Sequence, residues 1–233
     1  MNIIDLAILL VLGVSVLFGV YYGFSVSLFK IISFVLSWFL SLIFHSSLSR
    51  YIVSRFPDLI NKIAYYSEGS SKTAFAHKIL PVSSLSNEQI ISIVDESGLP
   101  NLFSTRIQEN LINQNLDGLY NLGQYFDYTV ANVIMNLISF ILLFLSLQLI
   151  FTLAISLAQN ITELPVLIKF DGLAAAVLGL FRGILFLHII FAFIPLLYLL
   201  VPADILSIFL DGSKFIGFYM DINLFSSFVK GTF

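Results

Sequence analysis

The segment Phe170 to Gly183 reads F-D-G-L-A-A-A-V-L-G-L-F-R-G and opens a long apolar run. A helix turns by about 100° per residue, so one side of a helix over this segment carries five residues of interest. These are Asp171, Ala175, Gly179, Arg182 and Gly183. In lipid, where one apolar tail is like another, small residues spaced four apart let two helices approach closely. We therefore expect this face to be a helix contact in a membrane protein.

The composition of the whole chain supports a membrane location. Of its 233 residues, 58% are hydrophobic and 11% are charged, and the mean hydropathy is +0.98. Charged residues make up roughly a quarter of soluble proteins, so the solvent here is mostly lipid. The net charge of −3 and the absence of a basic run predict no nucleic-acid partner. The expected partners are the lipid bilayer and other membrane proteins, or a second copy of this chain.

Four apolar runs are long enough to cross ~30 Å of hydrocarbon. They predict membrane spans at about 4–20, 25–44, 133–155 and 176–201. The expected fold class is all-α: a polytopic membrane protein whose four transmembrane helices form two hairpins, residues 1–45 and 128–202. Gly19 and Gly23 are expected to end the first span.

Residues 46–127 carry most of the charges and are expected to be an extramembrane region of short amphipathic helices. Ser86 and Gln89 form a capping box, which predicts a helix start. A second helix is predicted from apolar residues at helical spacing, and its face should cover the membrane surface or another helix. These residues are Leu102, Phe103, Ile107, Leu111 and Ile112. Residues 203–233 are predicted to be an amphipathic C-terminal tail.

Polar residues within the third span indicate a possible second class of function. Asn132, Asn136, Ser139 and Ser146 share one helical face, whereas Gln148, Thr152 and Gln159 lie near the opposite face. Buried amides need hydrogen-bond partners, so this helix should contact different neighbours along its length. Burial between helices is one interpretation. A hydrophilic pathway, to which His188 in the fourth span would contribute, is the other.

We expect no catalytic, cofactor-binding or metal site. Cysteine is absent, and His45, His77 and His188 lie far apart without the spacing of metal ligands. Ser27 and Lys30 match an S-x-x-K pattern but lack the companion motifs that give it meaning. The sequence therefore predicts a protein that is not an enzyme and needs no cofactor.

Two blocks of this chain resemble the colicin V production protein family, which are small bacterial inner-membrane proteins. In the first block, Gly19, Gly23 and Phe24 match the family's Arg-Gly-xxx-Gly-Phe pattern, and Phe18 replaces its arginine. The second family pattern is Asp-Arg-xx-Gly-xxx-Gly-xx-Arg-Gly. Asp171, Gly179, Arg182 and Gly183 match it, while Gly172 and Ala175 replace its first arginine and first glycine.

The resemblance implies a four-helix, multi-pass protein of the bacterial inner membrane. It also implies a role in supporting the production or export of colicin V-type toxins, or in maintaining the envelope. A channel or transporter component is the alternative that the polar residues of the third span leave open. The two short turns within the hairpins are expected on the cytoplasmic side, with Arg182 at the cytoplasmic edge of the fourth span.

Overall fold

The computed structural model describes residues 2–116, 118–158, 171–194, 196–197, 206, 208, 210 and 212–221. Within these residues every regular element is helical, which confirms the all-α prediction, and one isolated bridge joins Pro81 to Asn121. Three helices in this part of the chain are long and apolar enough to cross a membrane. They are α1 (Ile3–Arg55), α6 (Leu122–Ala158) and α7 (Asp171–Phe191).

The chain divides into two compact units. The first comprises the described parts of 1–41 and 142–225, and the second the described parts of 42–141. The boundary between these units falls within α1, which continues to Arg55, and within α6, which begins at Leu122.

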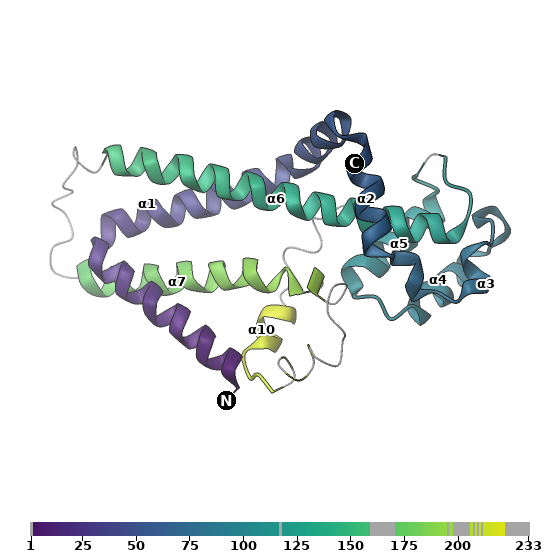
Figure 1. The fold of residues 1–233 in the computed structure, drawn as a ribbon. Coiled ribbons are helices and arrows are strands. Elements are labelled where there is room, and N and C mark those ends of the chain that lie inside the picture. The colour runs from purple at the N-terminus through teal and green to yellow at the C-terminus, as the bar shows by residue number, and fades with distance from the viewer. Residues whose placement is uncertain are drawn as a thin grey trace. The chain divides into compact units, whose positions relative to one another are not determined.

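A single glycine breaks α1 into two helical halves. Gly23 has φ 74° and ψ 172°, a conformation that residues with a Cβ atom rarely adopt. Figure 1 shows the two halves diverging from this break. The sequence placed a helix end at both Gly19 and Gly23. The structure ends the first half only at Gly23, and Gly19 stays helical.

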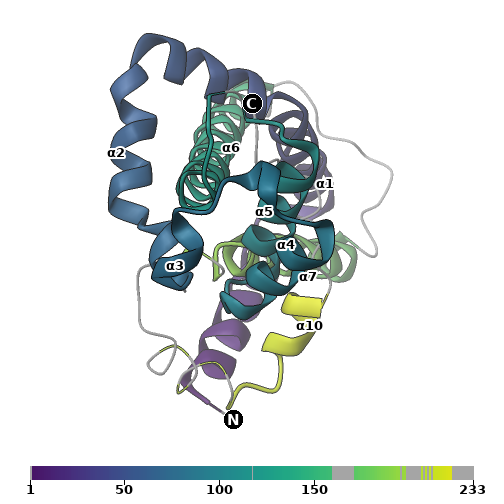
Figure 2. The ribbon, with the colours of Figure 1, turned by 90° about the vertical axis from the view of Figure 1, so that its right-hand side faces the viewer.

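The core of the first unit joins the N-terminal half of α1, α7 and the short helix α10 (Ile216–Asp221). Its buried members are Ile8, Leu187, Phe191, Ile194, Leu210 and Tyr219. Figures 1 and 2 both show α10 beside the start of α1. Of the predicted amphipathic tail, this short helix is described, and 222–233 lie outside the described residues. The predicted end of the fourth span at 201 also lies outside them.

The second unit contains several short helices between α1 and α6. They are α2 (Pro57–Ser67), η1 (Gly69–Lys72), α3 (Phe75–Lys78), η2 (Val82–Ser84), α4 (Asn87–Glu96) and α5 (Asn101–Asn113). The capping box at the start of α4 is confirmed. The backbone amide of Gln89 donates to the Ser86 hydroxyl, and the backbone amide of Ser86 donates to Gln89 Oε1. Ile60 and Ala64 of α2 pack on Ala131 and Met135 of α6. Figure 2 shows α2 and α6 side by side.

The apolar face of α5 is covered by protein. Leu102, Phe103, Ile107 and Leu111 are each at most 4% exposed, whereas Ile112 is 40% exposed. Of the two surfaces that this face could cover, the structure selects other helices of the same unit. α5 is therefore part of a folded core, and its contacts include a hydrogen bond from Asn110 Nδ2 to the Thr129 hydroxyl of α6.

Candidate functional site

The first half of α1 and α7 meet where both helices lack side-chain bulk. A Cβ atom added at Gly19 would overlap the carbonyl oxygen of Ala175. One added at Gly179 would overlap the carbonyl oxygen of Ser15, and one added at Gly183 would lie 2.9 Å from the Ser15 side chain. The backbones of the two helices are therefore in direct contact, as small residues at four-residue spacing allow in membranes.

Asp171, the first residue of α7, is bound to the break in α1. The amide of Phe24 donates a 2.9 Å hydrogen bond to Asp171 Oδ1. A Cβ atom at Gly23 would lie 2.9 Å from Asp171 Oδ2. A helix start leaves its first amides unsatisfied and carries partial positive charge, so a carboxylate there is favourable. Asp171 thus supports the second half of α1, 147 residues away, as well as opening its own helix.

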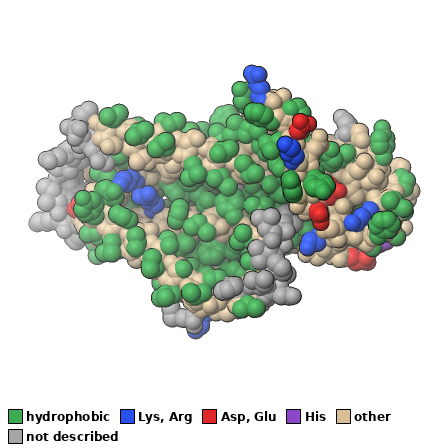
Figure 3. All heavy atoms as spheres, in the orientation of Figure 1, with side chains coloured by type: hydrophobic (Ala, Val, Ile, Leu, Met, Phe, Trp, Pro, Cys, Tyr) green, Lys and Arg blue, Asp and Glu red, His purple; other side chains and the backbone are tan. Residues whose placement is uncertain are grey.

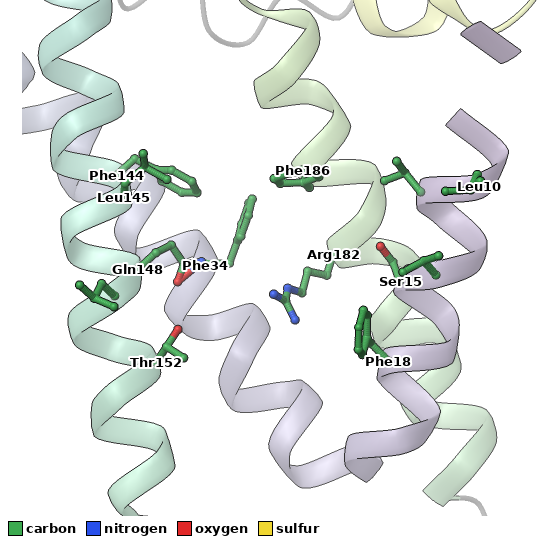
Figure 4. A pocket seen from close by; sticks show the side chains of 13 residues that line it. Leu10, Ser15, Phe18, Phe34, Phe144, Leu145, Gln148, Thr152, Arg182 and Phe186 are labelled. Carbon is green, nitrogen blue, oxygen red and sulfur yellow. The ribbon is translucent and has the colours of Figure 1, made fainter. Parts of the chain in front are cut away.

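A cavity of about 610 Å³ lies among the two halves of α1, α6 and α7, all within the first unit. Its lining is mainly apolar and aromatic. Figure 4 shows Arg182 of α7 reaching into the cavity, with Gln148 and Thr152 of α6 on the opposite side and Ser15 of α1 nearby. Because α7 begins at Asp171, Arg182 lies roughly 16 Å along the helix, near its middle. A span starting at 176 would have placed it at the edge.

A second cation, Lys30, is linked to Arg182 through Tyr22. Lys30 Nζ is 2.9 Å from the centre of the Tyr22 ring. Arg182 and Tyr22 also line a small pocket beside the α1–α7 contact. Among the described residues the ion pair is Arg106–Glu109, in the other unit, so neither Lys30 nor Arg182 forms an ion pair with a described carboxylate. Two like charges in apolar surroundings are costly and attract an anion.

Figure 3 shows the same character at the surface. Over α1, α6 and α7 the surface is mainly hydrophobic, with Lys and Arg side chains set among the apolar ones. The site therefore combines positive charge with a lipid-like wall.

The polar residues of α6 separate into two groups. Asn132, Asn136 and Ser139 are at most 3% exposed within the second unit, whereas Gln148 and Thr152 line the cavity of the first. Ser146, which shares the face of the first group, is exposed. Gln159 lies outside the described residues. Different parts of α6 thus meet different surroundings, as the amide pattern predicts.

His188 does not line the cavity. Its Nδ1–H donates to the carbonyl oxygen of Ile184 at 3.1 Å, and its ring contacts Phe218 and Tyr219 of α10. Burial in this cluster raises the pKa of the Tyr219 phenol. The part of the chain that the structure describes contains no group of three His, Cys, Asp or Glu side chains that could hold a metal ion.

Sequence reasoning missed Asp5, a fully buried carboxylate near the start of α1. Its Oδ1 accepts from the Ser213 hydroxyl at 2.6 Å and from the Lys214 amide at 3.0 Å, while Oδ2 accepts from the Asn2 amide. These bonds tie the segment before α10 to the N-terminal end of α1. The signal in the sequence was an acidic residue at the very start of an apolar run.

The family comparison agrees with the resemblance of the two blocks. The family model described as colicin V production protein matches residues 4–98 and 102–223. The match includes the middle region as well as both motif blocks. No curated protein and no solved structure matches this chain significantly.

Proposed function

This chain belongs to the colicin V production protein family, and we propose that it is an accessory protein of the bacterial inner membrane. In this role it supports the production or export of colicin V-type toxins, or the maintenance of the envelope. The observation that carries the proposal is the family match over most of the chain. The three long apolar helices support membrane residence.

We further propose four membrane crossings. The break at Gly23 divides α1 into two helices, each of sufficient length to span, and α6 and α7 supply the other two. Lys30 lies nearer to the break at Gly23 than to the far end of α1, Lys169 lies in the sequence that connects α6 and α7, and Arg182 lies near the middle of α7. Following the excess of Lys and Arg on the cytoplasmic side, these connections are cytoplasmic. The N-terminus and residues 46–127 then lie on the outer side.

Reporter fusions test this orientation. A fusion after Phe29 is expected to give a cytoplasmic signal, and fusions after Asn115 and Thr232 a periplasmic one. Enzymatic reporters that are active on only one side of the membrane make the measurement. A cytoplasmic signal from the fusion after Asn115 would reverse the orientation.

The role proposed here is that of a binding partner and not of an enzyme, with no cofactor and no nucleic acid involved. The partners are the bilayer and other membrane proteins or a second copy of this chain. The residues of the motif blocks support this: Asp171 accepts a hydrogen bond from the Phe24 amide beside the break of α1, and the glycines let α1 and α7 approach closely. Each acts on the architecture of the bundle.

Genetic complementation tests the role. A bacterial host that produces colicin V and lacks its own family member is expected to secrete little active toxin. Expression of this chain should restore the zone of growth inhibition on a sensitive lawn, and the Gly179→Leu variant should not. If the deletion strain shows both a normal inhibition zone and normal resistance to detergent, the proposed role is wrong.

A channel or transporter component is the second candidate. The cavity favours it, because Gln148, Thr152 and Arg182 place polar groups inside the helical bundle. Flux of ions or solutes through proteoliposomes distinguishes the two. A channel predicts flux that Gln148→Leu reduces and that Asn136→Leu, outside the cavity, leaves unchanged.

A further inference from the structure

We propose that the cavity among α1, α6 and α7 binds one anionic phospholipid. Its phosphate lies against Arg182 and Lys30, and an acyl chain lies along the apolar wall. This inference requires membrane residence but not the accessory role in toxin production.

The charge of the site selects an anion. Arg182 reaches into the cavity. Lys30 is held over the ring of Tyr22, and Tyr22 and Arg182 line the same small pocket. Two carboxylates of this unit are engaged elsewhere, since Asp171 accepts from the Phe24 amide and Asp5 from the Ser213 hydroxyl. A guanidinium and an ammonium together match a phosphate, with strong, charge-assisted hydrogen bonds.

The wall of the cavity selects a lipid. Leu10, Leu145 and Leu149 line it and are nevertheless 63%, 59% and 62% exposed, so the cavity opens onto the apolar outer surface of the helices. A water-soluble anion gains nothing from such a wall, whereas an acyl chain buries apolar area along it. The volume of about 610 Å³ lies within the usual range of ligand pockets, roughly 300–1,000 Å³.

The polar groups also lie at a suitable depth. The break at Gly23 and the start of α7 mark one end of this bundle, because Asp171 binds the Phe24 amide there. Lys30 lies about 10 Å and Arg182 roughly 16 Å along their helices from that end, and both side chains can extend toward the headgroups. Across the cavity, the Gln148 amide and the Thr152 hydroxyl can donate to phosphate or glycerol oxygens.

Binding is measured on the purified full chain in detergent, with phosphatidylglycerol as the probe and phosphatidylcholine and inorganic phosphate as comparisons. Native mass spectrometry counts bound lipid, and a thermal shift assay reports stabilisation. Phosphatidylglycerol should bind with a stoichiometry of one and raise the melting temperature. Phosphatidylcholine and millimolar phosphate should do neither.

Charge variants test the headgroup site. Arg182→Gln and Lys30→Gln should each weaken phosphatidylglycerol binding by about five-fold, the usual effect of one cation near an anionic lipid. The matched controls are Arg50→Gln and Lys62→Gln, which remove exposed cations of the second unit. If the control variants weaken phosphatidylglycerol binding equally, the effect comes from general surface charge, and the proposal is wrong.

A steric variant tests the acyl-chain site and remains informative if Arg182→Gln fails to accumulate. Leu149→Trp should fill the cavity and weaken binding, whereas Leu153→Trp, on an equally exposed position outside the lining, should not. If both tryptophan variants bind as the wild type does, the lipid lies elsewhere. If inorganic phosphate stabilises the protein and competes with the lipid, the site recognises free phosphate, and the lipid assignment is wrong.

Discussion

Gly179→Leu is expected to separate α1 from α7 and to remove most of the folded protein from the membrane. The reason is the absence of space, since even a Cβ atom at Gly179 would overlap the carbonyl oxygen of Ser15 and lie 3.1 Å from Gly19 Cα. Both neighbours are backbone atoms, so no side chain can rotate away. The two helices must move apart along the whole contact, and the packing that replaces a hydrophobic driving force in lipid is lost.

The smaller Gly179→Ala substitution allows a graded measurement. It should cost about 1–3 kcal/mol, the usual range for extra volume in a close-packed contact, and the leucine more. The matched control is Gly13→Ala, in the half of α1 that contacts α7. A Cβ atom added at Gly13 meets nothing within 4 Å. Membrane accumulation and the melting temperature in detergent are measured for each. If the Gly179→Ala and Gly13→Ala variants have the same melting temperature, the contact at Gly179 does not hold the two helices together.

The helical spacing of the small residues was readable from the sequence, but their partners were not. The steps of four residues from Ala175 to Gly183 place them on one side of any helix. Which helix they meet depends on tertiary packing, and the Ser15 carbonyl that Gly179 approaches carries no sequence signal at all. Gly19 was read as a helix end because glycine commonly marks one. Here its missing side chain serves the same contact.

The environment of the charges was even less readable. Asp171 was expected to open its own helix, and its hydrogen bond to the Phe24 amide spans 147 positions of sequence. Arg182 was expected at the edge of a span that starts near residue 176, and the structure places it near the middle of a helix that starts at Asp171. The cavity that it enters is formed by three helices, and no local pattern predicts a void among them.

Gly23→Ala is the second substitution expected to have a large effect, because the backbone there excludes a side chain. At φ 74° and ψ 172° a non-glycine residue is strained by about 1–3 kcal/mol. The added Cβ atom would also lie 2.9 Å from Asp171 Oδ2 and press the carboxylate away from the Phe24 amide. The two halves of α1 should then lose both the angle between them and their attachment to α7.

Pairing this change with Asp171 separates the two causes. Asp171→Leu removes the acceptor without straining the backbone and leaves the partly buried Phe24 amide without this partner, which should cost up to about 1–3 kcal/mol. If crowding of the carboxylate causes most of the loss, the double variant should melt close to Asp171→Leu alone. If backbone strain causes it, the two losses should add. Gly172→Ala, at a site where a Cβ atom meets nothing within 4 Å, is the control. If the Gly23→Ala protein accumulates to the same level as the control and has the same melting temperature, the two halves of α1 do not need the backbone conformation seen at Gly23.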